Sequence, residues 1–329
     1  MRIHIQNNPK QPAVFNVSPE QWGEALARAG KAEAGYFVSF GESDGEFTAV
    51  GPDIDILISG PGTIKHLLPD LQPDRAPKLK MIFSVAAGID AIPADRVPPV
   101  PYVNNRGAHA EKAGEFVAMA LLMLAGGMPE CIADQQNKVW GQRFTQGLRG
   151  RRATILGLGA MGGASAEQAK HFGMHVTGLR TRPAPHPACD RVLPTDDLDA
   201  VLAETDFLII SAPLTPATRK ILNKDRIALM PKGAYVINIG RGPLIDQDAL
   251  CDALDDGFLA GAVLDVFDPE PVPADDRVWT TRNMIMTPHV SVDDAISYVP
   301  RSLDIFFANL AALETGKPLL TPVDFSRGY

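Results

Sequence analysis

Cysteine is scarce in this chain of 329 residues, which contains only Cys131, Cys189 and Cys251. The three thiols are widely spaced and show neither a metal-ligand spacing nor a pairing pattern, so the sequence favours a reducing compartment and predicts no metal site. Residues 1–12 lack the apolar core of a secretory signal. We therefore expect a cytoplasmic protein.

Long hydrophobic runs and an excess of positive charge are also missing. The longest apolar stretch, residues 116–128, is short for a membrane span and follows Glu115, which favours a buried helix and no membrane association. The formal net charge of -8 argues against binding to nucleic acids. A hydrophobic content of 45% with 21% charged residues is typical of a globular protein, and the length suits two domains.

From Ala153 onward, apolar segments and helical patterns alternate. Near-continuous apolar strands separated by helices are typical of a parallel sheet covered on both faces. Ligands bind such doubly wound sheets outside the carboxyl ends of the strands. We expect strands at 153–158, 174–179, 206–212, 234–240, 261–267 and 283–288, and helices at 160–172, 196–204, 217–230 and 247–257, the last with Asp246 as its N-cap.

The first hundred residues carry a weaker α/β pattern, with strands expected at 2–6, 53–59 and 79–85 and a helix at 20–30. Pro98, Pro99 and Pro101 mark a crossing into a second domain. The tail reads as helical on both sides of Pro300, which should kink or break the helix, and it returns to the first domain. We predict a discontinuous first domain, 1–101 with 290–329, and a second domain, 102–289.

Gly157, Gly159 and Gly162 form a G-x-G-x-x-G pattern between an expected strand and an expected helix. The first glycine suits a tight turn, the second leaves room for a pyrophosphate, and the third lets helix and strand pack closely. The helix start at Ala160 and Met161 then offers free N–H groups to the phosphates. The pattern predicts a dinucleotide site, and the alternative is an ordinary glycine-rich turn.

The end of the next strand indicates which dinucleotide binds. NAD-binding sites of this kind carry Asp or Glu about 20 residues beyond the glycines. This chain has Arg180, Thr181 and Arg182 there, which can pair with a 2'-phosphate that an acid would repel. We therefore favour NADP(H), and the alternative is two solvated arginines beside a site that accepts NAD(H).

Arg241, Glu270 and His289 each follow an expected strand, so we predict that they meet at the carboxyl edge of one sheet. An arginine can hold a substrate carboxylate, a histidine can protonate a new hydroxyl, and a carboxylate can orient the histidine. That combination is what hydride transfer to a 2-oxo acid requires. The alternatives are a loop-bonding arginine, a surface glutamate and a satisfied loop histidine.

Five segments, LGLGAMG, SAPLTPATRKILN, MPKGAYVINIGRGPLIDQDAL, GAVLDVFDPEP and TPHVS, resemble the D-isomer-specific 2-hydroxyacid dehydrogenase family, and within it the NADPH-dependent glyoxylate and hydroxypyruvate reductases. The resemblance implies two doubly wound parallel-sheet domains. One is a Rossmann dinucleotide-binding domain, and the other is a smaller flavodoxin-like substrate-binding domain. It makes Arg241 the substrate-binding arginine, His289 the general acid/base and Glu270 its partner.

The same resemblance implies further contacts. Backbone N–H groups in the loop 85–90, including Ala87 and Gly88, would meet the substrate carboxylate. Asp265 would lie beside the nicotinamide amide, and the helix around 115–124 would contribute to a homodimer. The cofactor would also be lined by Ser211, Ala212, Pro213, Leu214 and Ile239.

One departure leaves the substrate open. Residues 290–295 read VSVDDA, without the small glycine or alanine that many relatives carry, so Val292, Asp293 and Asp294 are expected to reshape the pocket mouth. We expect reduction of a small 2-oxo acid by NADPH. The alternatives are a cofactor-sensing interaction protein like the dehydrogenase-related corepressors, and a phosphite dehydrogenase. Formate oxidation is disfavoured because similar formate enzymes carry Gln in place of Glu270.

Overall fold

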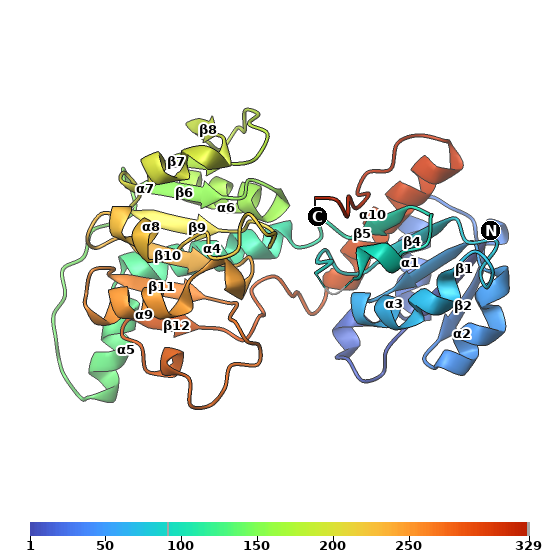
Figure 1. Ribbon diagram of the computed structural model, residues 1–329, viewed down its shortest axis with the longest axis horizontal. Helices are drawn as coiled ribbons and strands as arrows, with labels where there is room; N and C mark the ends of the chain where they lie inside the picture. Colours follow the sequence, from blue (N-terminus) through green and yellow to red (C-terminus); the bar gives the residue numbers. More distant parts are fainter. Residues whose placement is uncertain (91, 328–329) are drawn as a thin grey trace. The chain divides into compact units, whose positions relative to one another are not determined.

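The structure is a computed structural model that describes residues 1–90 and 92–327. The chain folds into two compact units, Met1–Ala108 with Asp294–Tyr329, and His109–Asp293. The sequence suggested boundaries at 101/102 and 289/290. Ala91 and residues 328–329, which belong to the first predicted domain, lie outside the described residues. Each unit is an α/β layer structure built on one parallel sheet (Figure 1).

The first unit has a five-stranded parallel sheet in the order β2-β1-β3-β4-β5, which is the flavodoxin-like order. Its strands are β1 (Arg2–Gln6), β2 (Phe37–Gly41), β3 (Ile56–Ser59), β4 (Met81–Ser84) and β5 (Tyr102–Asn104). Its α-helices are α1 (Pro19–Arg28), α2 (Asp44–Val50), α3 (Pro61–Leu67) and α10 (Tyr298–Glu314).

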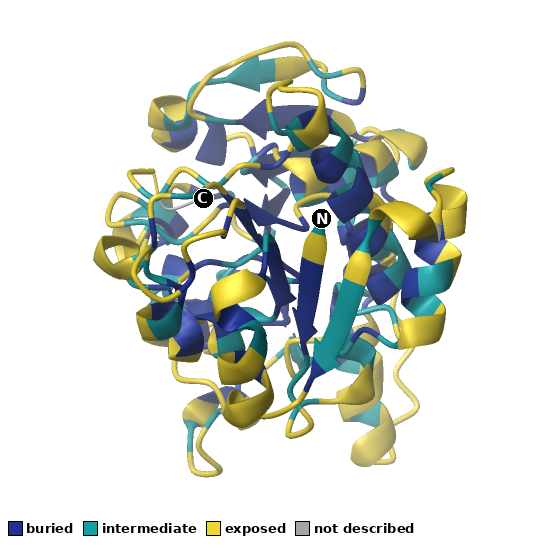
Figure 2. Cartoon of the chain, turned by 90° about the vertical axis from the view of Figure 1, so that its right-hand side faces the viewer, coloured by how far each residue is buried: buried dark blue, intermediate teal, exposed yellow. Residues whose placement is uncertain are grey.

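The sequence indicated β1, β3 and β4 but neither edge strand. Two of the three inner strands, β3 and β4, are buried at every position, whereas most of the edge strand β2 is only partly buried (Figure 2). An edge strand that faces water on one side needs no continuous apolar run, so β2 left little trace in the sequence. The short β5 pairs with β4, and this pairing keeps residues beyond 101 in the first unit.

The helix predicted after Pro300 forms, but the predicted helix before Tyr298 and the break at Pro300 were wrong. Helix α10 begins at Tyr298, so Pro300 lies in the first turn, where its missing N–H needs no partner. Before the helix, the carboxylate of Asp294 accepts hydrogen bonds from the backbone N–H groups of Ile296 and Ser297, which holds a turn. The helix then packs on α1, where the rings of Trp22 and Phe307 lie 5.0 Å apart.

The second unit has a seven-stranded parallel sheet in the order β12-β11-β10-β9-β6-β7-β8, the Rossmann order with one added strand. Its strands are β6 (Arg152–Leu156), β7 (His175–Leu179), β8 (Arg191–Leu193), β9 (Phe207–Ile210), β10 (Tyr235–Asn238), β11 (Gly261–Leu264) and β12 (Met284–Met286). Its α-helices are α4 (Ala110–Ala125), α5 (Met128–Gln136), α6 (Ala160–His171), α7 (Leu198–Leu202), α8 (Lys224–Leu229) and α9 (Gln247–Asp255).

The strand order of the second sheet reverses at β6, since β7 and β8 lie on one side of it and β9 to β12 on the other. This reversal is the switch point at which doubly wound sheets bind their ligands. Among the described residues, no single helix is long and apolar enough to cross a membrane, and only the bent pair α4 and α5 meets the length and composition test together.

The predicted helix at 217–230 is mostly absent. Only α8 forms, because the side chain of Asn223 accepts a hydrogen bond from the backbone N–H of Arg226 and so caps a helix that begins at Lys224. Residue 222 instead bridges to Ile245. Asp246 takes the predicted N-cap position of α9 but makes no capping bond, since its carboxylate pairs with Lys220 at 3.1 Å.

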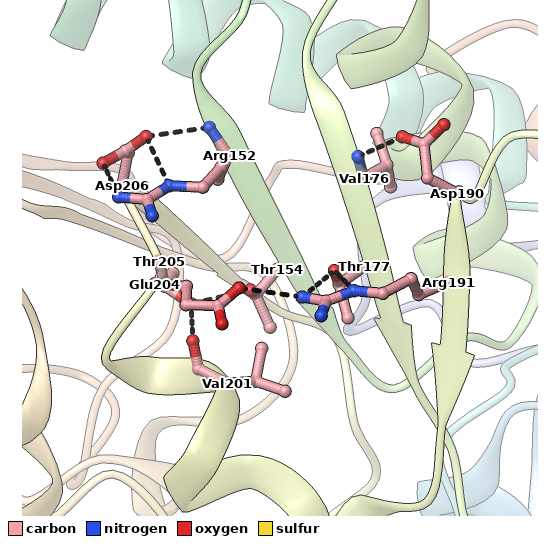
Figure 3. A network of polar contacts seen from close by, with 10 residues as sticks. All are labelled: Arg152, Thr154, Val176, Thr177, Asp190, Arg191, Val201, Glu204, Thr205 and Asp206. Atoms are coloured by element: carbon pink, nitrogen blue, oxygen red, sulfur yellow. Dashed lines mark hydrogen bonds and ion pairs between the residues drawn. The ribbon is translucent and has the colours of Figure 1, made fainter.

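A network of polar contacts lies at the amino ends of β6, β7 and β8, with Arg152 paired to Asp206 at 3.1 Å and Arg191 paired to Glu204 at 3.1 Å (Figure 3). It borders a cavity of about 310 Å³. Arg152 begins β6, whereas Gly157 follows its last residue. The cavity and the glycine-rich turn therefore lie at opposite edges of the sheet.

Candidate active site

The glycine-rich turn has the geometry that a bound dinucleotide needs. Gly157 has a φ of 98°, and a Cβ on Gly162 would lie 1.9 Å from the carbonyl oxygen of Gly157, so neither position accepts a side chain. A Cβ on Gly159 would meet nothing within 4 Å, which leaves open space before the first turn of α6. The hydroxyl of Ser211 donates to the Gly157 carbonyl at 2.7 Å and braces the turn.

The arginines after β7 lie next to this turn. The backbone N–H groups of Gly157 and Leu158 both donate to the carbonyl of Leu179, at 3.0 and 3.2 Å, and Arg180 follows directly. Within residues 1–90 and 92–327, neither Arg180 nor Arg182 forms an ion pair. Their positive charges are therefore not neutralised by a carboxylate of the described chain.

Arg241 lies in a turn that Asn238 organises at the carboxyl end of β10. The Asn238 side chain donates to the carbonyl of Arg241 and accepts from the N–H of Gly240, both at 3.0 Å. The Arg241 guanidinium donates to the Gly240 carbonyl at 2.8 Å. A Cβ on Gly242 would lie 2.0 Å from the backbone of Phe267, so glycine is required there. Asn238 was not predicted from the sequence, although an amide that ends an apolar strand is a signal for such a role; in the structure it is fully buried.

His289 and Glu270 form a hydrogen-bonded pair beyond β12 and β11. The Nδ1 of His289 lies 2.8 Å from one carboxylate oxygen of Glu270, and the other oxygen accepts from the backbone N–H of Phe267 at 2.8 Å. A carboxylate can only accept, so Nδ1 carries the proton and the ring directs Nε2 away from the glutamate. The side chain of His289 is 43% exposed, which leaves this nitrogen accessible to a reactant.

Asp265 is fully buried and fixes the loop that carries His289. One of its carboxylate oxygens accepts from the hydroxyl of Thr287 at 2.6 Å and from the N–H of Val290 at 2.8 Å. The other accepts from the N–H of Ser291 at 3.0 Å. His289 itself has a φ of 56°, and its N–H donates to the Asp265 carbonyl at 2.9 Å. This hydrogen-bond set holds a non-glycine residue in the left-handed region, so the position of the imidazole depends on Asp265.

Replacing Asp265 with Asn should therefore destabilise the fold and loosen the loop that carries His289. An amide cannot accept all three hydrogen bonds, and the loss of charge-assisted bonds to a buried group should lower the free energy of unfolding by about 2 kcal/mol. We expect the urea midpoint and the turnover rate to fall together. The exposed Asp256→Asn is the matched control. An unchanged urea midpoint for Asp265→Asn would contradict this account.

In the first unit, the loop 85–90 follows β4, and its carbonyl groups accept hydrogen bonds from neighbouring side chains. Asn104 donates to the Ala87 carbonyl at 2.8 Å, and the Val85 carbonyl accepts from Asn105 at 2.7 Å and from the hydroxyl of Tyr298. In the described part of the chain, no carbonyl or side chain accepts from the N–H groups of Ala87 and Gly88. The sequence did not indicate this set of anchoring residues.

Comparisons with known proteins show the family to which the chain belongs. A sequence model of the D-isomer specific 2-hydroxyacid dehydrogenase NAD-binding domain matches residues 118–291, more than half of the chain. A glyoxylate reductase of Thermofilum pendens is 31% identical over 255 residues, covering 74% of each chain. A glyoxylate/hydroxypyruvate reductase B of Yersinia pestis is 38% identical over 180 residues, which span 54% of this chain and 53% of that enzyme.

Among solved structures, the NADPH-dependent glyoxylate/hydroxypyruvate reductase of Sinorhizobium meliloti, in complex with NADP and sulfate, superposes with a TM-score of 0.80. It is 27% identical and covers 100% of this chain and 99% of its own. The fold and site thus define a nicotinamide-dependent oxidoreductase of 2-hydroxy and 2-oxo acids. The chain belongs to the D-isomer-specific 2-hydroxyacid dehydrogenase family, which confirms the resemblance and the predicted fold class.

Proposed function

We propose that this enzyme reduces a small 2-oxo acid to the 2-hydroxy acid with NADPH. The observation that carries the proposal is the His289–Glu270 pair, at 2.8 Å, beside the arginine turn of Arg241 at the same edge of the sheet. The names of relatives that reduce glyoxylate and hydroxypyruvate support the substrate class.

A nicotinamide cofactor, when bound, supplies a hydride to the carbonyl carbon. The residues that would hold it are the glycine-rich turn, Arg180 to Arg182 and the segments after β9 and β10, with Ala160, Met161, Ala212, Pro213 and Ile239 among them. They fit a dinucleotide because Gly159 leaves open space at the start of the twelve-residue helix α6, where phosphates are favoured. Asp265 stays a candidate for the nicotinamide amide.

The proton and the orientation of the acid come from the side chains. Arg241 holds the carboxylate of the 2-oxo acid with its planar fork. His289 donates the Nε2 proton to the carbonyl oxygen as negative charge develops there, and the Glu270 carboxylate stabilises the positive imidazolium. In the first unit, the N–H groups of Ala87 and Gly88 are candidate donors to a carboxylate, and we assign that unit as the substrate-binding domain.

The test of this function is a steady-state assay that follows the oxidation of NADPH and of NADH with glyoxylate, hydroxypyruvate, pyruvate and a bulkier 2-oxo acid. We expect much higher kcat/KM with NADPH on the two- and three-carbon acids. The absence of turnover with every acid would overturn the proposal and favour cofactor sensing, whereas turnover of phosphite with NAD(P)+ would favour the phosphite dehydrogenase.

The two arginines after β7 should decide the choice of cofactor. Replacing Arg180 and Arg182 together with Gln removes the charges that we assign to the 2'-phosphate, so the Kd of NADPH should rise about 10²-fold while that of NADH changes little. Isothermal titration gives both values. Lys224→Gln with Lys232→Gln removes two exposed charges elsewhere and serves as the control. Equal losses for the two cofactors would refute the 2'-phosphate role.

We also propose that the enzyme is a homodimer formed through α4, α5 and the segment that follows α5. Trp140 and Phe144 in that segment are each 95% exposed, which is unusual for large apolar side chains on a monomer. Sedimentation velocity should show a dimer for the native chain and a monomer for Trp140→Ala with Phe144→Ala. Phe37→Ala, on the edge strand β2, is the control and should leave the dimer intact. A native chain that sediments as a monomer would overturn this proposal.

A further inference from the structure

The loop that carries His289, residues 287–293, ends at the acidic residue Asp293, which the mechanism above does not use. Its backbone N–H approaches the carbonyl of Val290 at 3.4 Å, and the neighbouring Val292 carbonyl lies 3.2 Å from Nδ1 of His109 at the start of α4. Asp265 fixes the intervening N–H groups of Val290 and Ser291. Asp293 and His289 therefore lie on one loop whose backbone is held at both ends.

Among the residues that the structure describes, Asp293 differs from Glu270 and Asp265 in that its carboxylate accepts no hydrogen bond. Both carboxylate oxygens of Glu270 accept hydrogen bonds, and so do both of Asp265. The carboxylate of Asp293 forms no hydrogen bond or ion pair within the described residues 1–90 and 92–327, although it is half-buried. Its carboxylate oxygens are therefore available to a ligand that reaches this loop.

Asp293 interacts electrostatically with His289, the histidine to which we assign proton transfer. Burial raises the pKa of its carboxyl above the usual range, the nearby imidazoles of His109 and His289 oppose this shift, and Asp265 adds to it. Burial also lowers the pKa of His109, which favours its neutral ring. His109 therefore adds little permanent positive charge to balance an ionised Asp293 beside His289.

We propose that Asp293 is a specificity-determining residue, a negatively charged side chain on the same held loop as His289 that excludes 2-oxo acids carrying a second acid group. This inference rests on the proposed function. The single carboxylate of a 2-oxo monoacid pairs with Arg241. A 2-oxo diacid has a second carboxylate, which the negative charge of Asp293 repels. The same charge favours substrates whose side chain is uncharged or donates a hydrogen bond, such as the hydroxyl of hydroxypyruvate.

The test compares Asp293→Asn with the native enzyme, using NADPH with 2-oxobutanedioate and with 2-oxobutanoate, which differ by one carboxylate. We expect the kcat/KM ratio of diacid to monoacid to rise about tenfold or more, since repulsion between two charges in a partly buried site is lost. Asp275→Asn, an exposed acid that forms no ion pair in the described chain, makes the same change in net charge and should leave the ratio unchanged. An unchanged ratio for Asp293→Asn would overturn the proposal.

A binding measurement distinguishes the failure of this proposal from the failure of the proposed function. Oxamate and oxalate have nearly the same shape but carry one and two negative charges, and their Kd values for the enzyme loaded with NADP+ need no turnover. Asp293→Asn should tighten oxalate relative to oxamate. If the native enzyme reduces no 2-oxo acid, the proposed function fails, and the ratio of the two Kd values still decides the role of Asp293. Equal changes for both ligands would refute it.

Discussion

Replacing His289 with Ala should lower kcat for 2-oxo acid reduction by about 10²–10⁴-fold, the range that positioned general acids contribute. The structure explains why the loss should be this large. Nδ1 is engaged by Glu270 at 2.8 Å, so Nε2 is the one ring nitrogen left to deliver the proton, and the left-handed backbone of His289 aims it. The glycine-rich turn follows β6 and His289 follows β12, four strands away in the sheet, so the Kd of NADPH should stay nearly unchanged.

Single-turnover kinetics and cofactor titration together check this prediction. Glu270→Gln is the informative companion, because glutamine can still accept from Nδ1 but removes the charge that stabilises the imidazolium. We expect its kcat to fall between that of the native enzyme and that of His289→Ala. If His289→Ala turned over at the native rate, the assignment of the general acid would be wrong. A large loss of NADPH affinity would instead show that the variant disturbs the cofactor site.

Replacing Gly162 with Ala should damage both the fold of the second unit and its cofactor site. The new methyl group would lie 1.9 Å from the carbonyl oxygen of Gly157 and 2.7 Å from the hydroxyl of Ser211, so backbone must move. Overpacking of this kind costs about 1–3 kcal/mol, which should lower the thermal midpoint of a unit of this size by about 2–12 °C. A displaced turn would misplace the dinucleotide, and kcat/KM should fall about 10²-fold.

Gly159→Ala is the matched comparison for Gly162→Ala. A Cβ at Gly159 meets nothing within 4 Å in the chain, so the thermal midpoint should stay close to native. The methyl group would nevertheless occupy the space that we assign to the pyrophosphate, and the Kd of NADPH should rise. Calorimetric melting with and without NADPH separates the two effects. Equal midpoints for the native enzyme and Gly162→Ala would contradict the packing argument.

Much of the site could be predicted because its signals are local. Glycines spaced between an apolar strand and a helix specify a tight turn, and polar residues directly after apolar strands fall at the carboxyl edge of a parallel sheet. These rules correctly placed Gly157 after β6, Arg241 after β10 and His289 after β12. The roles of these residues stay predictions that the experiments above test.

The sequence by itself determined the doubly wound architecture and the positions of the inner strands along the chain, because a strand buried on both faces must be apolar throughout and leaves a continuous pattern. Tertiary structure alone decided the edge strands β2, β5 and β8 and the hydrogen bonds by which Asp265 holds the loop of His289. It also decided that the Asp293 carboxylate accepts no hydrogen bond from the described residues. The reason is physical. Pairing at a sheet edge and hydrogen bonds between residues more than twenty positions apart depend on which segments the fold brings together, and no local pattern encodes that proximity.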